Sequence, residues 1–225
     1  MKKYNQYILS ILFITCVFVN LIYIVNSIHF QNKTIKNEYE IMDENIVFFG
    51  DSITYQYNLK EYFKGHNVVN KGINGNKTED LVRRLDDLYL YNPSKIFILI
   101  GINDLTEKLE IDDIINDYSI IIKSIKENRK YAKIYVESVY PINMDVIKSI
   151  KKERHYHLNN ETISELNSKI KELCYQENVT YINVYDKLLD DEGKLKEKYT
   201  TDGLHISHLG YLRISAILNK YIKGD

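Results

Sequence analysis

The chain has 225 residues, of which 44% are apolar and 27% charged, a composition typical of a globular protein and not of a disordered one. Its 30 basic and 31 acidic residues give a net charge of −1, and no basic stripe stands out, so nothing supports nucleic-acid binding. The two cysteines, Cys16 and Cys174, lie in separate apolar patterns and exclude a disulfide framework.

The N-terminal segment is apolar and uncharged from Tyr4 to Ile28. Its central run, Tyr7–Val25, approaches the length of about 20 residues that a helix needs to cross a membrane. Lys2 and Lys3 precede the run, which favours an N-terminus on the cytoplasmic side. We therefore expect residues 1–28 to form a transmembrane signal-anchor that places the remainder outside the cell membrane. Secretion after cleavage of a signal peptide is the alternative.

Residues 29–43 are polar with little periodicity and are predicted to form a linker to a domain that spans residues 44–225. In this domain short apolar runs alternate with helical patterns. The predicted strands are Ile46–Phe49, Asn67–Asn70, Lys95–Ile100, Lys133–Val136 and Val179–Val184. The predicted helices are Ile53–Phe63, Thr78–Tyr89, Ile111–Glu127, Glu161–Gln176 and Leu209–Tyr221, and Pro141–Leu158 is predicted to be a polar loop. The alternation indicates an α/β fold with helices on both faces of a parallel sheet.

The first strand is followed by Gly50-Asp51-Ser52, directly before a predicted helix. A serine on such a turn presents its hydroxyl at the end of the strand. Its backbone N–H lies near a helix N-terminus, where the partial positive charge favours an anion. Taken alone, the same residues are more typical of a helix cap.

Two further turns follow strands at the same predicted edge of the sheet. Gly72 and Gly75, after the second strand, let the backbone approach a ligand closely, although a simple turn is the alternative. Asn103, after the third strand, carries an amide that can donate to an oxyanion, although it could instead bond its own backbone.

A fourth segment places a carboxylate three residues before an imidazole. Asp202 and His205 lie just before the last predicted helix. An Asp in this position can hold the His in one tautomer and stabilise its charged form. Helix-start chemistry with a surface histidine is the alternative.

Together, the four segments resemble in order and spacing the sequence blocks of the SGNH hydrolases, also called the GDSL family. The resemblance covers most of residues 45–220 and rests on Phe49–Thr54, Asn70–Gly75, Gly101–Asp104 and Thr201–His205, continued by His208–Tyr211. It implies a flavodoxin-like, three-layer αβα sandwich around a mostly parallel five-stranded sheet. It also implies a serine esterase that uses no cofactor and no metal.

The resemblance assigns roles to individual residues. Ser52, Asp202 and His205 are the implied catalytic triad. The backbone N–H groups of Ser52 and Gly75, with the side-chain amide of Asn103, are the implied oxyanion hole. The choice of Gly75 over Gly72 rests on the family pattern alone.

Other residues near these motifs have weaker support. Asp51, Tyr55, Tyr57 and Asp104 are predicted to line the substrate pocket, and packing is the alternative for the two tyrosines. His155 and His157 have a spacing that can bind zinc on a strand, but they lie in a charged segment without cysteines, so a solvated or substrate-facing loop is favoured. His208 lacks an acid three residues earlier, which favours His205 as the base.

We expect a hydrolase that cleaves carboxylic esters of an envelope glycan, a lipid or a small alcohol, tethered to the membrane by its N-terminal helix. The first alternative is an O-acyltransferase, which would pass the acyl group to a sugar hydroxyl instead of water. The second is a catalytically silent carbohydrate-binding domain on the same fold.

Overall fold

The computed structural model describes residues 15–31 and 45–223, and the chain divides into two units, Met1–Met42 and Asp43–Asp225. In the first unit, residues 15–31 form a helix with exposed side chains. Within the described ranges, no helix is both long and apolar enough to cross a membrane. The transmembrane segment predicted for residues 1–28 is therefore not supported. Residues 1–14 of that prediction, and most of the predicted linker, lie outside the described residues.

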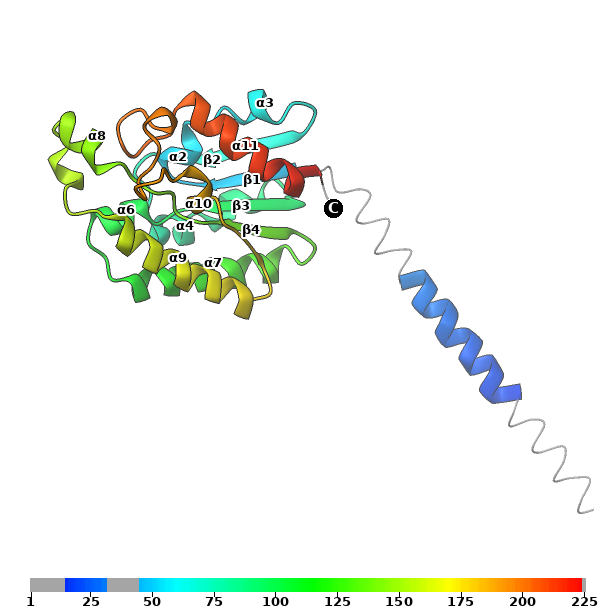
Figure 1. The fold of residues 1–225 in the computed structure, drawn as a ribbon. Coiled ribbons are helices and arrows are strands. Elements are labelled where there is room, and N and C mark those ends of the chain that lie inside the picture. The colour runs from blue at the N-terminus through cyan, green and yellow to red at the C-terminus, as the bar shows by residue number, and fades with distance from the viewer. Residues whose placement is uncertain (1–14, 32–44, 224–225) are drawn as a thin grey trace, which may run out of the picture. The chain divides into compact units, whose positions relative to one another are not determined.

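A five-stranded parallel sheet forms the centre of the second unit, as predicted (Figure 1). The strands lie in the order β2-β1-β3-β4-β5, and each pair of neighbours is parallel. Their bounds are Asn45–Gly50 for β1, Asn67–Gly72 for β2, Lys95–Leu99 for β3, Lys133–Glu137 for β4 and Thr180–Ile182 for β5. Since all strands run the same way, their carboxyl ends share one edge. The chain leaves β1 toward β2 and returns to β3, so the crevice of such a sheet opens beside β1.

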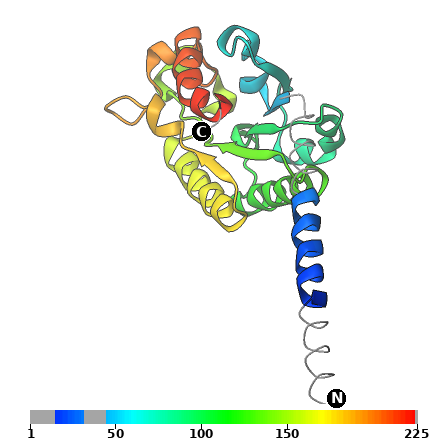
Figure 2. The same cartoon turned by 90° about the vertical axis from the view of Figure 1, so that its right-hand side faces the viewer.

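Helices cover both faces of the sheet and complete three layers. Figure 1 shows α11 and α3 over one face and α4, α7 and α9 over the other, and Figure 2 shows α7 and α9 together on their side. The α-helices are α2 (Ser52–Tyr55), α3 (Leu59–Tyr62), α4 (Thr78–Arg83), α5 (Leu85–Tyr89), α6 (Ile102–Thr106), α7 (Ile111–Asn128), α8 (Met144–Ser149), α9 (Asn160–Gln176), α10 (Tyr185–Leu188) and α11 (His208–Lys223). Two 3-10 turns, η1 (Glu153–His155) and η2 (Glu197–Tyr199), lie in the connections.

Apolar burial explains why these segments form these elements. Every residue of β3 is buried, which fits a central strand covered on both faces. Helix α7 buries Ile114, Tyr118 and Ile121, which recur at helical spacing on one face. On the opposite face of the sheet, the Tyr57 ring stacks on Tyr211 of α11 with centroids 4.5 Å apart.

Two predicted helices are each divided into two shorter ones. The helix predicted over Ile53–Phe63 is broken because the Asn70 amide donates to the carbonyls of Thr54, at 2.7 Å, and Tyr57, at 3.0 Å. These carbonyls are the acceptors that a continuous helix would need. The helix predicted over Thr78–Tyr89 is interrupted at Arg84, whose φ of −116° and ψ of 26° lie outside the helical region.

The predicted loop Pro141–Leu158 contains regular structure that periodicity did not show. Helix α8 begins after Asn143, whose side chain accepts from the N–H of Val146 as a cap, at 3.3 Å. The turn η1 follows at Glu153–His155, so the segment contains two short helical elements. We call residues 141–158 the α8–η1 segment.

Candidate active site

Three side chains from distant parts of the chain form a continuous hydrogen-bonded line. The hydroxyl Oγ of Ser52 lies 3.1 Å from Nε2 of His205. On the other side of the ring, Nδ1 of His205 lies 2.7 Å from Oδ2 of Asp202. Both distances are hydrogen-bond distances, so the hydroxyl, imidazole and carboxylate have the order of a nucleophile, a base and an orienting acid.

The turn between β1 and α2 positions Ser52. Asp51 caps α2 by accepting the N–H of Ile53 at 2.8 Å, so the helix begins at Ser52. Gly50, just before, is tightly enclosed, because a Cβ there would lie 2.3 Å from the carbonyl oxygen of Leu99. The turn therefore fits closely against β3. Ser52 is 7% exposed, so the turn buries most of this residue.

The loop before α11 positions the other two residues. Thr200 forms a bridge with Ile206 and donates its hydroxyl to the carbonyl of His205 at 2.7 Å, which closes the loop into a tight turn. Gly203 lies inside that turn with a φ of +89°, a conformation that L side chains rarely adopt. The turn folds Asp202 back against its own His205.

The carboxylate of Asp202 is held in its ionised form. Its Oδ1 accepts the N–H groups of Leu204, at 3.0 Å, and His205, at 2.7 Å. Its Oδ2 accepts Nδ1 of His205 and the ammonium of Lys152. Burial alone would raise the pKa of Asp202, but these bonds outweigh it and lower the pKa well below its usual range. The acid therefore remains an acceptor throughout the neutral range.

The predicted oxyanion donors lie on two loops that contact each other. The amide of Asn103, in the first turn of α6, donates to the carbonyl of Asn76 at 2.9 Å. An amide carries two N–H groups, so one such bond fixes its orientation and leaves a second donor. Gly75 precedes Asn76, with a φ of +78° and no atom within 4 Å of a Cβ built on it. Its backbone is therefore open to a ligand.

Gly72 has a different role from Gly75. A Cβ at Gly72 would lie 2.1 Å from the N of Tyr55 and 2.6 Å from the carbonyl carbon of Thr54. The absence of a side chain lets the end of β2 contact the backbone of α2, the helix that carries Ser52. The geometry gives Gly72 a packing role and leaves Gly75 as the open position of the pair.

Arg84 bonds the turns that follow β1 and β2. Its guanidinium donates to the carbonyls of Gly50, at 2.8 Å, and Lys71, at 2.9 Å, while its Nε donates to the side chain of Asn76 at 2.8 Å. The same group lies 4.3 Å from the centroid of the Phe49 ring. A single side chain thus fastens the turns that follow β1 and β2 to each other.

Comparison with known proteins agrees with this geometry. A family model described as the GDSL-like lipase/acylhydrolase family matches residues 48–213, which is most of the chain. The chain belongs to this GDSL-like family. The prediction made from the four sequence blocks is confirmed at the level of the family.

Solved structures show the same fold as this GDSL-like protein. A structure from Streptococcus pneumoniae, described as a candidate platelet activating factor, is 32% identical, with a TM-score of 0.74 over 91% of this chain and 98% of that one. A GDSL-like lipase from Bacteroides thetaiotaomicron is 21% identical, with a TM-score of 0.71 over 86% and 96% of the two chains. At 32% identity, the first structure is a relative of this chain over 91% of its length. At 21% identity, the second supports only the similarity of fold.

A curated relative is a protein of different size. The N-acylneuraminate cytidylyltransferase of Streptococcus agalactiae serotype III is 24% identical over 161 residues, which are 72% of this chain and 34% of that protein. The chain therefore spans about a third of the length of the curated relatives it matches.

The structure places the residues predicted to line the pocket at different depths. Asp51 and Asp104 are fully buried, and Tyr57 is 5% exposed within an aromatic cluster, so these three lie in the interior of the domain. Asp104 accepts the N–H of Thr78 at 3.0 Å, and thus braces α4 against α6. Burial raises the pKa of Asp51 to about 7. Tyr55 is 58% exposed at the surface.

The remaining histidines are separate from the line that begins at Ser52. His208 bonds the hydroxyl of Tyr62 through Nδ1, at 2.7 Å. His157 bonds the carbonyl of Leu105 through Nε2, at 3.2 Å. His155 is half-buried, and burial lowers its pKa. In the described part of the chain, no group of three or more His, Cys, Asp or Glu is arranged to hold a metal ion.

Sequence reasoning missed the residues that support the site. Lys152 and Arg84 carry no motif, and both belong to ordinary charged stretches. Asn70 lay within the second sequence block but was not given a role. A single polar residue at the end of a buried strand was the available signal for Asn70, because such a group needs hydrogen-bond partners. For the two cations, only the folded structure shows the contacts.

Proposed function

We propose that the domain is a carboxylic ester hydrolase that forms an acyl-enzyme on Ser52. The observation that carries the proposal is the pair of contacts made by one imidazole, 3.1 Å to Ser52 Oγ and 2.7 Å to Asp202 Oδ2. Membership of a lipase/acylhydrolase family supports the same chemistry.

The geometry suits a two-step reaction. His205 Nε2 takes the proton of Ser52 as its oxygen bonds the carbonyl carbon, and then gives that proton to the departing alkoxide. Water, activated by the same imidazole, breaks the acyl–oxygen bond, releases the carboxylic acid and restores the hydroxyl. Asp202 keeps Nδ1 protonated, so that Nε2 is the free base.

The negative oxygen of the tetrahedral intermediate needs donors in fixed positions. Three groups are proposed to supply them: the N–H of Ser52, the N–H of Gly75 and the amide of Asn103. Neither of the two backbone N–H groups has a hydrogen-bond partner among the described residues, and the amide is oriented by Asn76. Preorganised donors of this kind are usually a large part of the rate enhancement.

The proposed substrates are carboxylic esters of an envelope glycan, a lipid or a small alcohol. Acyl transfer to a sugar hydroxyl uses the same acyl-serine, and product analysis with and without a glycan acceptor separates the two reactions. Transfer would give an acylated acceptor in place of free acid.

The test of the nucleophile uses a serine-directed fluorophosphonate and p-nitrophenyl acetate. Ser52→Ala should abolish both labelling and turnover. Ser168→Ala is the matched control, because its exposed hydroxyl only bonds the carbonyl of Ser164 in α9. Labelling of the Ser52→Ala protein at the wild-type level would assign the nucleophile to another residue.

We also propose that the domain acts outside the cytoplasmic membrane. The uncharged run between Tyr4 and Ile28 supports this location, because export signals contain such a run. Added protease should digest the domain in intact cells, or the domain should be found in the medium. Protection until the cells are lysed would contradict the proposal.

A further inference from the structure

The strongest feature outside the proposed catalytic groups is a lysine that contacts the triad. Lys152 lies between α8 and η1 and forms an ion pair with Oδ2 of Asp202. This is the same carboxylate oxygen that accepts Nδ1 of His205. The side chains are partly desolvated, with 35% of Lys152 and 17% of Asp202 exposed.

The segment that carries Lys152 is fastened to the triad loop at its base. The N–H of Asn143 donates to the carbonyl of Gly203 at 2.7 Å. A Cβ at Gly203 would lie 2.5 Å from the carbonyl oxygen of Asn143, so the two backbones pack without a side chain between them. The N–H of Lys152 then bonds the carbonyl of Ile147 at 3.2 Å, which folds the lysine back over α8.

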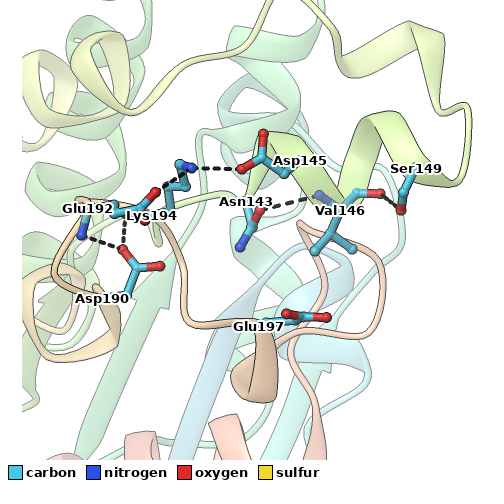
Figure 3. Close-up of a pocket in the computed structure, with 8 residues that line it drawn as sticks. All are labelled: Asn143, Asp145, Val146, Ser149, Asp190, Glu192, Lys194 and Glu197. Carbon is cyan, nitrogen blue, oxygen red and sulfur yellow. Dashed lines mark hydrogen bonds and ion pairs between the residues drawn. The ribbon is translucent and has the colours of Figure 1, made fainter.

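A second attachment holds the outer side of α8. A cavity of about 340 Å³ separates α8 from the loop after α10, and Figure 3 shows polar side chains across it. Lys194 spans the space by bonding Asp145 of α8 at 2.7 Å and Glu192 at 2.8 Å. The amide of Asn143 donates to the carbonyl of Leu195 at 2.9 Å. The α8–η1 segment is therefore held on two sides, which restricts the positions that Lys152 can adopt.

Lys152 is not needed to orient the carboxylate. Without it, Asp202 would still accept three donors, namely the N–H of Leu204 and both the N–H and Nδ1 of His205. The ammonium of Lys152 adds a positive charge beside Asp202, the carboxylate that stabilises the protonated ring of His205. By Coulomb's law this charge opposes a second positive charge on the ring.

We propose that Lys152 acts electrostatically through Asp202 and keeps His205 in its neutral, proton-accepting form at lower pH than the triad alone would allow. The inference rests on the proposed function, because the neutral imidazole is the base that activates Ser52. It extends that function by linking the α8–η1 segment to the pH range in which the site works.

Other charged or titratable groups face the same imidazole. Ser52 and Asp202 contact it directly, Asp51 lies behind the nucleophile, and His155 of η1 interacts electrostatically with both Asp202 and His205. Burial and the neighbouring cations lower the pKa of His155, which favours its neutral form. Among the residues that the structure describes, Lys152 is the cation in direct contact with the Asp202 carboxylate.

The test compares Lys152→Met, Lys152→Arg and the control Arg154→Met in the full chain. Arg154 lies on the same segment but pairs with Glu107, at 3.3 Å, and not with the triad. The measurement is kcat/KM for p-nitrophenyl acetate from about pH 4.5 to about pH 8.5. In Lys152→Met, the midpoint of the rise of kcat/KM at acidic pH should move to higher pH by roughly half to one unit. The other two variants should keep the wild-type midpoint.

The direction of this pH shift follows from the loss of the positive charge of Lys152. Without the ammonium, the protonated form of the His205 ring is less disfavoured. The neutral ring that acts as the base therefore forms only at higher pH, and the rise of kcat/KM moves with it. The plateau at high pH should change less than about threefold, because three donors still hold Asp202. An equal loss of activity at every pH, with an unmoved midpoint, would reduce Lys152 to a structural contact and overturn the inference.

A second measurement is independent of turnover. Titration of the ring protons of His205 by NMR should show the same upward shift in Lys152→Met and none in Arg154→Met. An inactive wild-type protein that shows this shift would refute the proposed function and retain the electrostatic inference. Identical titration curves in all variants would refute the inference, even if the esterase activity is high.

Discussion

Replacing Gly72 by alanine tests how the end of β2 fixes the nucleophile. The added Cβ would lie 2.1 Å from the N of Tyr55, where ordinary van der Waals contact begins at about 3.4 Å. The obstacle is backbone and cannot rotate away, so α2 must move. We expect a loss of about 3 kcal/mol in the free energy of unfolding, at the upper end of overpacking effects. We also expect roughly a 100-fold loss in kcat/KM, because Ser52 moves with the helix.

Gly75→Ala is the matched control for stability. No atom lies within 4 Å of its Cβ, so only the strain of a φ of +78° remains, about 1 kcal/mol. Urea denaturation followed by far-UV circular dichroism measures both variants, and hydrolysis of p-nitrophenyl acetate measures the effect on Ser52. An unfolding free energy of Gly72→Ala within about 0.5 kcal/mol of wild type, or an equal loss for the two alanine variants, would contradict the packing role of Gly72.

Two further predictions concern the oxyanion donor and a buried acid. Asn103→Ala should lower kcat roughly 10²- to 10³-fold while the unfolding free energy falls by only about 1 kcal/mol, the value of its bond to Asn76; near wild-type turnover would remove Asn103 from this role. Glu137, 2% exposed at the end of β4, has its pKa raised to about 7 by burial, so the folded state binds its proton more tightly than the unfolded state. Wild-type stability should therefore decrease as the pH rises from about 4.5 to about 7, by up to about 3 kcal/mol, and Glu137→Gln should lose less over the same range in urea denaturation; parallel pH profiles would contradict this.

The sheet was readable from the sequence because its strands are buried on both faces. Runs such as Lys95–Ile100 have no polar alternation, which is typical of a central parallel strand. Each predicted strand overlaps an observed one, and the long helices α7 and α9 begin within a residue of prediction. Apolar periodicity is strongest in such long, covered elements.

The short elements were not predictable in the same way. The break between α2 and α3 depends on the amide of Asn70, and the break between α4 and α5 on the contacts of Arg84. Both are tertiary hydrogen bonds that compete with helical ones, and local pattern does not contain them. The α8–η1 segment is held mainly by polar contacts, so it shows little apolar period.

The site likewise contains residues that the sequence predicted and residues that only tertiary contacts reveal. Ser52, Asp202 and His205 were found because a family pattern links them, and the structure brings their side chains within hydrogen-bond distance. The buried positions of Asp51 and Asp104 could not be predicted, because adjacency in sequence to a site residue does not show which way a side chain points. Asp51 points inward as a helix cap. Lys152 approaches the site from a segment that is remote in sequence from the triad loop.

The guanidinium of Arg84 restricts sequence changes on one side of the crevice, because it bonds both of the turns there. On one wall, the turns after β1 and β2 share a single fork of donors, so an insertion in either turn would pull the acceptors of the other out of alignment. The α8–η1 segment is fastened instead to the triad loop, through Asn143 and Gly203, and in the described part of the chain no hydrogen bond joins it to the turn that carries Ser52. We therefore expect changes of length and sequence in that segment to leave the position of Ser52 unaltered.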